Sequence, residues 1–186
     1  MKTKIVALIA SMVMIPVAQS QSMKIGQEKA VACQGCHGSN GVSINGIGPH
    51  LAGQTASYIE RQLKNFKSKS RQYAPMNAMA AGLSDEDIDN LAAFFAAQSL
   101  SVSNPVDRSL AGQGKAKAAM CLGCHGGKAE GRGQFPRLAG QKPQYLEKQL
   151  RDFKAGKRQG GPMNAVAKGL SEQDISALSH YFASLK

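Results

Sequence analysis

Two short pentads constrain the fold of this 186-residue chain more than any other feature. They read Cys33-Gln34-Gly35-Cys36-His37 and Cys121-Leu122-Gly123-Cys124-His125, and together they use all four cysteines of the chain. Both have the form C-x-x-C-H, the attachment signature of c-type haem, in which two thiols bind the ring and the histidine binds the iron. The pattern predicts two covalently attached c-type haems, one at each pentad.

A C-x-x-C pair alone is compatible with other chemistry. Such pairs occur in redox dithiols, in halves of zinc sites and in disulfides. A thioredoxin-like dithiol needs a βαβ context, which the sequence lacks, and a four-cysteine zinc site does not explain a histidine directly after both pairs. We therefore favour haem at both positions.

The first twenty residues are typical of an export signal rather than of a folded domain. Lys2 and Lys4 precede an apolar run from Ile5 to Val17, and small residues follow at Ala18-Gln19-Ser20. The run is too short for an ordinary membrane-spanning helix, although an uncleaved N-terminal anchor is the alternative interpretation. We expect residues 1–20 to be a cleaved signal peptide and the mature protein to lie in the periplasm.

The rest of the chain is a tandem duplication. Leu51-Ala52-Gly53-Gln54 returns as Leu138-Ala139-Gly140-Gln141, and Pro75-Met76-Asn77-Ala78 returns as Pro162-Met163-Asn164-Ala165. The repeat predicts two similar domains over residues 21–102 and 107–186, with a linker at 103–106 in a stretch rich in Ser, Asn and Pro. With no Trp and only ten Phe and Tyr, each small domain needs its haem to complete a core.

Each repeat is predicted to be all-α, because no stretch has a convincing strand pattern. A short helix is expected before each pentad, over 25–32 and 110–120. Thr55 or a neighbour is expected to cap the next helix, and Pro143 is expected at the first helical position of its counterpart in the second repeat. Apolar residues then recur at helical spacing, and Ser84-x-x-Asp87 and Ser171-x-x-Asp174 resemble capping boxes. The apolar stripes are Ile59, Leu63 and Phe66 with Leu146, Leu150 and Phe153, and later Ile88, Leu91, Ala92 and Phe95 with Ile175, Leu178 and Phe182.

The second axial ligand of each iron is expected to be a methionine, because thioether sulfur is soft and binds ferrous iron well. Met76 and Met163 occupy equivalent places in the two repeats, whereas Met79 aligns with Val166. The repeat therefore favours His37 with Met76 and His125 with Met163 as the metal ligands. Met79 is expected to pack against the haem.

Several polar residues are weaker candidates. A ligating histidine usually donates its other ring N–H to a carbonyl, and Pro49 and Pro136 lie in matched loops after the pentads. Arg71 and Arg158 also match and either pair with haem propionates or are solvated charges. The unmatched histidines are expected to be surface residues rather than ligands; they are His50 and His180.

The order of these motifs resembles the dihaem cytochrome c4 family over essentially the whole predicted mature chain. The resemblance rests on the signal peptide, both C-x-x-C-H pentads, both Leu-Ala-Gly-Gln runs and both Pro-Met motifs. It implies two class I cytochrome c domains that face each other, with the propionate edges of the haems near the interface. It also implies periplasmic electron transfer toward a terminal oxidase, with possible peripheral association with the membrane.

The predicted function is electron transport rather than catalysis, since two strong protein ligands leave no open position on either iron. The alternatives are a cytochrome subunit of a flavocytochrome c-type sulfide dehydrogenase or another dehydrogenase, and a haem peroxidase.

The positive charge of the chain is unevenly divided between the two predicted domains: residues 21–104 carry a net +1 and residues 105–186 a net +8. Nucleic acid is a poor alternative partner. The cations either keep the domain soluble or steer it toward an acidic partner or membrane; the candidates are Lys128, Arg132, Arg137, Lys154, Lys157 and Arg158.

Overall fold

The computed structural model describes the chain over residues 15–44 and 46–186, with side chains from residue 21. Those residues form helices and loops with no named strand; one isolated bridge joins Arg132 and Phe135. The all-α prediction is thus confirmed for the described part of the chain. The helices are α1 (Ile15–Ala30), a 3-10 turn (Val31–Cys33), α2 (Gln34–His37), α3 (Ala56–Lys67), α4 (Ala74–Ala81), α5 (Asp85–Ala96), α6 (Arg108–Lys117), α7 (Ala119–His125), α8 (Pro143–Lys154), α9 (Pro162–Lys168) and α10 (Glu172–Ser184).

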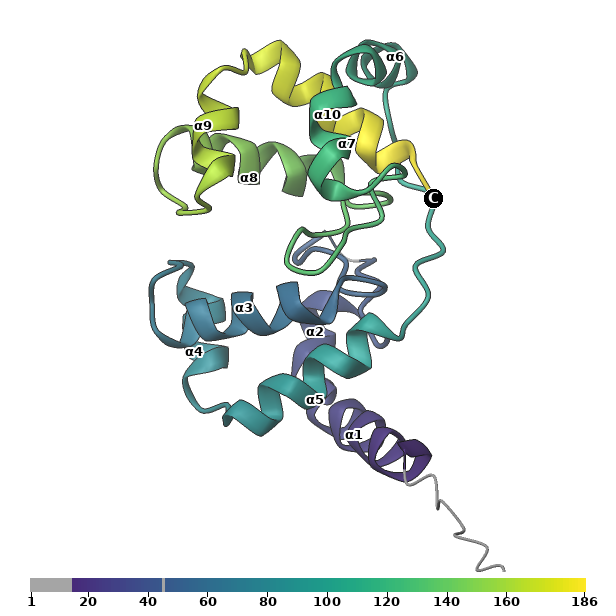
Figure 1. Cartoon of the computed structure of the whole chain (residues 1–186), viewed down its shortest axis with the longest axis vertical. Helices are drawn as coiled ribbons and strands as arrows, with labels where there is room; N and C mark the ends of the chain where they lie inside the picture. Colours follow the sequence, from purple (N-terminus) through teal and green to yellow (C-terminus); the bar gives the residue numbers. More distant parts are fainter. Residues whose placement is uncertain (1–14, 45) are drawn as a thin grey trace, which may run out of the picture.

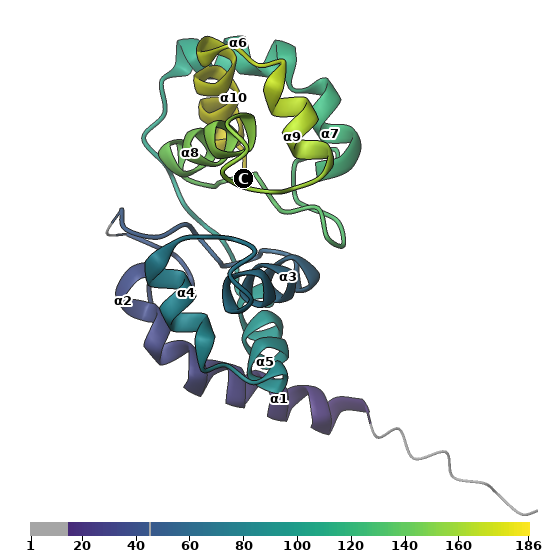
Figure 2. The same ribbon diagram turned by 90° about the vertical axis from the view of Figure 1, so that its left-hand side faces the viewer.

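The helices form two bodies stacked along the long axis of the molecule. Figure 1 shows α1 to α5 below and α6 to α10 above, joined by an extended connection along one side, and Figure 2 shows the same division from a second direction. The connection has no regular structure from residue 99 to 107. Asn104 in it donates to the carbonyls of Gly140 (2.8 Å) and Ala183 (3.2 Å), which fastens the connection to the second body.

The two cores are built from equivalent residues. In the first domain Ile59, Leu91 and Phe95 are buried together, and in the second Leu146, Leu178 and Phe182 take their places. Leu63 and Leu150 are only half-buried at the edges of the predicted stripes. The helical periodicity therefore identified the buried faces correctly in both repeats.

The first and last long helices of each domain cross at a glycine. A Cβ added at Gly26 of α1 would lie 2.2 Å from the carbonyl oxygen of Asn90 in α5. A Cβ added at Gly114 of α6 would lie 2.1 Å from that of Ala177 in α10. Only glycine lets the helix backbones approach this closely, so these two positions set how closely α1 packs on α5 and α6 packs on α10.

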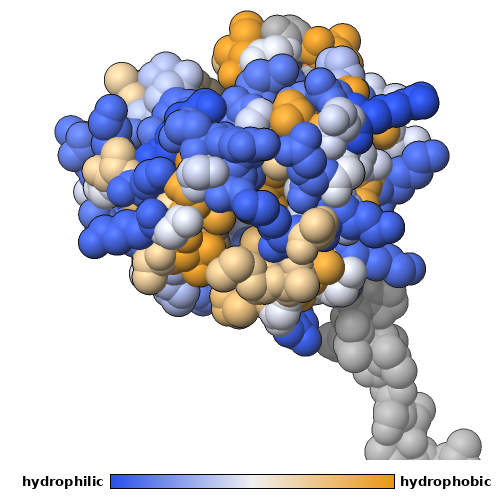
Figure 3. All heavy atoms as spheres, turned by 90° about the horizontal axis from the view of Figure 1, so that it is seen from above, coloured by the Kyte–Doolittle hydropathy of each residue, from blue (hydrophilic) through white to orange (hydrophobic). Residues whose placement is uncertain are grey.

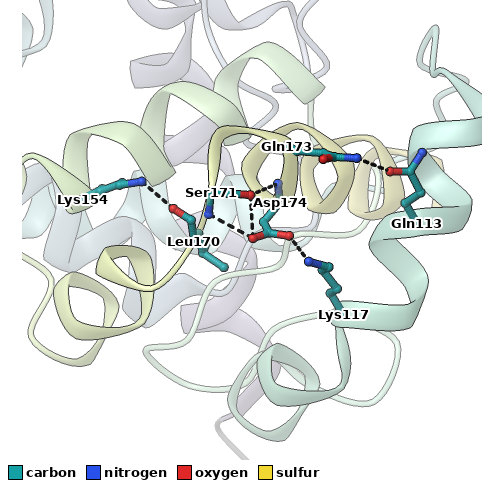
Figure 4. Close-up of polar contacts among 7 residues, drawn as sticks. All are labelled: Gln113, Lys117, Lys154, Leu170, Ser171, Gln173 and Asp174. Carbon is teal, nitrogen blue, oxygen red and sulfur yellow. Dashed lines mark hydrogen bonds and ion pairs between the residues drawn. The ribbon is translucent and has the colours of Figure 1, made fainter.

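Both predicted capping boxes are present at the starts of α5 and α10. Ser171 accepts from the backbone N–H of Asp174, whose carboxylate accepts from the backbone N–H of Ser171, and the same exchange joins Ser84 and Asp87. Figure 4 shows that Lys117 of α6 also reaches Asp174, so the cap ties two helices together. Nearby, Gln173 donates to Gln113 (3.0 Å) and Lys154 to the carbonyl of Leu170 (2.5 Å).

Two details of the helix predictions were wrong, and a third holds only in part. The helix before the first pentad begins at Ile15 rather than near residue 25, because it packs along α5 well upstream of the pentad. The helix before the second pentad begins at Arg108, where Asp107 caps it, and ends at Lys117 before α7 begins at Ala119. Thr55 is the N-cap residue of α3, as predicted, but its hydroxyl donates to the carbonyl of Gly133 (2.6 Å) and makes no capping hydrogen bond to the helix.

Pro143 occupies the first position of α8, as predicted. The predicted signal peptide falls mainly on residues 1–14, which lie outside the described residues. No helix within the described part of the chain is long and apolar enough to cross a membrane.

Candidate haem-binding sites

Each pentad lies on one or two helical turns that end at its histidine. The 3-10 turn and α2 carry Cys33, Cys36 and His37, and α7 carries Cys121, Cys124 and His125. All four thiols are free of disulfides; the first of each pair is half-buried and the second exposed. Burial raises the pKa of Cys33 and Cys121, which keeps these thiols protonated near neutral pH. Both thiols of each pair thus lie on one short helical segment next to the histidine.

The two pentad histidines are buried and oriented alike. His37 Nδ1 lies 2.9 Å from the carbonyl oxygen of Pro49, and His125 Nδ1 lies 2.8 Å from that of Pro136. The predicted role of these two prolines as carbonyl acceptors is therefore confirmed. Burial lowers the pKa of both histidines, which favours the neutral ring. A neutral ring that donates from Nδ1 presents the lone pair of Nε2, the form that binds a metal.

The loop behind His37 approaches it so closely that a side chain would not fit. A Cβ at Gly48 would lie 2.8 Å from both the carbonyl oxygen of Cys36 and Nδ1 of His37. The backbone N–H of Gly48 donates to that same carbonyl (3.1 Å). The ring plane of this histidine is therefore fixed by backbone on one side and by the Pro49 carbonyl on the other.

Met76 and Met163 occupy equivalent positions at the starts of α4 and α9, each directly after a proline in the first turn. Both are half-buried, whereas Met79 is 46 % exposed. Packing of Met79 against the haem stays a prediction. The choice of Met76 and Met163 as ligands stays a prediction.

An asparagine next to each methionine fastens its loop. Asn77 Nδ2 donates to the carbonyls of Phe66 (2.7 Å) and Arg71 (2.8 Å), and its Oδ1 accepts from the N–H of Tyr73 (2.8 Å). Asn164 makes the same three bonds to the corresponding groups of the second domain. Sequence reasoning gave these asparagines no role, although their repetition in Pro-Met-Asn was a usable signal.

Each domain thus offers two free thiols, a neutral imidazole nitrogen and a thioether sulfur. This donor set fits a covalent c-type haem with one nitrogen and one sulfur axial ligand. Within the described residues no group of three or more His, Cys, Asp and Glu side chains forms an alternative metal site. The residues present therefore fit haem and give no support to zinc.

The two arginines that were predicted as possible partners of the haem propionates lie at the boundary between the domains. Arg71 donates to Gln62 (2.8 Å), Gln149 (2.8 Å) and Tyr145 (3.3 Å), and its guanidinium stacks on Phe66. Arg158 repeats the pattern with the opposite set, donating to Gln62 (2.9 Å) and Tyr58 (2.8 Å) across the boundary. Neither is a solvated surface charge: Arg158 is only 7 % exposed. Propionate pairing stays a prediction, with the guanidinium groups already held between two domains.

The prediction that His50 is a surface residue was wrong. His50 is 4 % exposed, its Nδ1 accepts from the N–H of Ser43 (3.0 Å), and its backbone bonds to Gln141 of the other domain. It is buried because the domain boundary covers its loop. His180 is half-buried and accepts from the N–H of Asp107 (2.9 Å).

Known proteins support the same interpretation. The family model described as Cytochrome c matches residues 24–99 and 110–186. The cytochrome c4 of Pseudomonas aeruginosa is 38% identical over 175 residues, which cover 86% of this chain and 87% of that protein. A thiosulfate dehydrogenase electron acceptor of Stutzerimonas stutzeri is 36% identical, over 84% of this chain and 80% of its own length. The crystal structure of reduced recombinant cytochrome c4 from Pseudomonas stutzeri is similar with a TM-score of 0.81 and 37% identity, covering 88% of this chain and 98% of that one.

Proposed function

Because the chain belongs to the cytochrome c family, and within it to the dihaem cytochromes c4, we propose that it carries electrons in the periplasm to a terminal oxidase of a respiratory chain. That it is an electron carrier with two covalent c-type haems follows from the family and the two pentads. The destination of the electrons and the compartment are parts of the proposal. The observation that supports it best is the pair of C-x-x-C-H pentads, each with a buried histidine held at Nδ1 by a proline carbonyl.

The chain's residues would hold each haem through two thioether bonds and two iron ligands. Cys33 and Cys36 in the first domain, and Cys121 and Cys124 in the second, are the proposed thioether attachments; the proposed axial pairs are His37 with Met76 and His125 with Met163. When bound, each haem supplies reversible one-electron oxidation and reduction. The protein keeps both histidines neutral, fixes their ring planes and fastens the methionine loops. If both residues of each proposed pair bind the iron, no position on it would be left for a substrate, which favours a carrier over a peroxidase.

The cations of the second domain favour an acidic partner. Ion pairs already engage Lys117, Lys148 and Arg151. Of the six docking candidates, Arg158 is buried and Arg137 and Lys154 are half-buried, so these three are poor docking groups. The exposed remainder, which we call the basic triad, is Lys128, Arg132 and Lys157.

The surface of the second domain carries both hydrophilic and apolar residues. Figure 3, which looks down on this domain, shows a largely hydrophilic face with apolar residues at its upper and lower edges. Met120 and Phe135, on and beside the second pentad helix, are 64% and 43% exposed. Apolar area near the pentad with cations around it is the composition expected of a transient docking face.

The relatives named as thiosulfate dehydrogenase electron acceptors favour a second candidate, in which a dehydrogenase is the electron donor or the stable partner. The two candidates differ in a direct experiment. Protein reduced with ascorbate and freed of the reductant is mixed with membranes of the source organism, and its reoxidation is followed at the α-band. Cyanide-sensitive reoxidation is the expected result. Reduction by a purified thiosulfate dehydrogenase, combined with no reoxidation by membranes, would instead favour the dehydrogenase partner.

A further inference from the structure

Two buried glutamines exchange hydrogen bonds across the domain boundary. Gln54 Oε1 accepts from the backbone N–H of Arg137 (2.7 Å), and its Nε2 donates to the backbone carbonyl of Arg137 (3.1 Å). Gln141 does the same with His50, at 2.9 Å for both bonds. The two glutamines are 6% and 5% exposed and are equivalent in the repeat, so the exchange is reciprocal. The backbone N–H and carbonyl that each glutamine contacts also fix which end of its amide is oxygen.

The peptide groups that they contact are the ones that hold the pentad histidines. The N–H of Arg137 and the carbonyl of Pro136 belong to the same peptide unit, and that carbonyl accepts from Nδ1 of His125. In the first domain the N–H of His50 and the carbonyl of Pro49 form the peptide unit that accepts from His37. A continuous hydrogen-bonded chain therefore runs from Gln54 of the first domain to His125 of the second. Its counterpart runs from Gln141 of the second domain to His37 of the first.

Hydrogen bonds in such a chain strengthen one another. An acceptor at the N–H of a peptide polarises its carbonyl, which then accepts more strongly from the histidine. A histidine whose Nδ1 proton is drawn toward an acceptor is a more basic ligand through Nε2. A more basic ligand stabilises ferric over ferrous iron, which lowers the reduction potential.

We infer that each of these glutamines is a positioning residue for the axial histidine of the opposite domain, so that Gln54 tunes the second haem and Gln141 tunes the first. The inference rests on the ligand assignment proposed above. The tuning is then crossed between the domains, because a residue of one domain contributes to the reduction potential of the haem in the other.

A purely structural role makes a different prediction. Oε1 of Gln54 also accepts from the N–H of Thr55 at the start of α3, and that of Gln141 from the N–H of Lys142 at the start of α8, both at 3.0 Å. If holding these helix starts were the only role, substitution of Gln54 would disturb the first domain and its haem. The crossed chain instead places the effect in the second domain.

The test is the substitution Gln54→Met, which keeps the length of the side chain and removes both polar ends. Holoprotein labelled with 15N-histidine is titrated potentiometrically and followed by NMR, so that each axial histidine reports the midpoint of its own haem. We expect the second midpoint to rise, the Nδ1 resonance of His125 to shift in the reduced protein, and the first midpoint and His37 to keep their wild-type values. Gln141→Met should give the mirror result.

The matched control is Gln62→Met. Gln62 is also buried at the boundary, at 9% exposure, and accepts from Arg71 and Arg158, but it makes no bond to either peptide unit behind the histidines. Its substitution should leave the His125 resonance unchanged. An equal shift in Gln62→Met and Gln54→Met, or a Gln54→Met shift confined to the first haem, would overturn the inference.

A second substitution guards against a Gln54→Met protein that does not fold. Gln54→Glu keeps an acceptor oxygen toward the N–H of Arg137 and adds negative charge, so it should lower the second midpoint more than the first. A rise in the second midpoint would contradict the inference. Wild-type protein without two six-coordinate low-spin haems would defeat the ligand assignment, whereas an intact wild-type spectrum with no crossed shift would defeat the inference alone.

Discussion

Two glycines on α6 allow a controlled test of how the second domain is held together. Gly114 faces α10, where an added Cβ would lie 2.1 Å from the carbonyl oxygen of Ala177 and 2.8 Å from Cβ of Tyr181. Gly112, one half-turn away on the same helix, has nothing within 4 Å of an added Cβ. Alanine at these two positions therefore changes helix propensity equally and packing very differently.

The size of the difference follows from these contacts. Ordinary contact begins at 3.4 Å, so Gly114→Ala must part α6 and α10 at their crossing, and the atom met first is backbone that cannot rotate away. Overpacking of this kind costs about 1–3 kcal/mol or more, and at the upper end it outweighs the roughly 1 kcal/mol that alanine gains over glycine in a helix. We expect a net loss of about 2 kcal/mol in the stability of the second domain for Gly114→Ala, and a gain of about 0.5–1 kcal/mol for Gly112→Ala.

Native-state hydrogen exchange measures this domain by domain. Amide protection in α10 should fall by roughly 30-fold in Gly114→Ala and rise a few-fold in Gly112→Ala, because about 1.4 kcal/mol corresponds to a tenfold change. Amides of α5 in the first domain provide the internal reference. Equal protection of α10 in the two variants would refute the assignment of Gly114 as the crossing point.

Further predictions concern haem content, ligands, docking and acid stability. A pyridine haemochrome assay should find two haems per chain, and one haem would contradict the reading of both pentads. Met163→Ala and Met76→Ala should each remove one methionine-to-iron charge-transfer band and lower that haem's potential, whereas Met79→Ala should keep both bands; the reverse pattern would show that the repeat misassigns the ligand. Reversing the basic triad to Glu should slow electron exchange with the oxidase at low salt. The effect should be larger than that of reversing the first-domain lysines Lys64, Lys67 and Lys69, and the difference should shrink as added salt shortens the Debye length to about 8 Å. Equal slowing would refute steering by the second domain. Lys117 and Ser171 lower the pKa of Asp174 to about 2 from 3.8. The contribution of Asp174 to stability is therefore present above pH 3.8 and is lost as the pH falls toward 2. Asp174→Asn should flatten the acid unfolding of the second domain across that range, and an unchanged acid titration would show that the cap contributes nothing there.

Much of the molecule could be predicted because the sequence states it twice. The pentads and the caps at Ser84 and Ser171 each depend on local spacing, and each occurs in both repeats. Local spacing also predicted the hydrogen bonds from the pentad histidines to the two proline carbonyls, because a ligating histidine needs an acceptor and each loop offers a matched proline.

The domain boundary could not be predicted by the same reasoning. Gln54 and Arg71 are residue types that ordinarily face solvent, and helical periodicity shows which face is apolar without showing what a polar face contacts. His50 lies in a loop, where no periodicity indicates burial. The signal that was available, the recurrence of Gln54 as Gln141 and of Tyr58 as Tyr145, became interpretable only once the two halves were seen to face each other.

The extended connection between the domains has a consequence for how strong their interface must be. A short tether confines two complementary faces to an effective concentration on the order of millimolar. At that concentration a dissociation constant near 1 mM, or about 4 kcal/mol, already keeps half the molecules closed. An interface of glutamine, tyrosine and arginine hydrogen bonds therefore needs to be only somewhat stronger than this to keep the two domains closed within one chain, whereas two separate proteins would need a much lower dissociation constant. Tethering thus relaxes the demand for a large apolar interface and leaves these positions available for tuning.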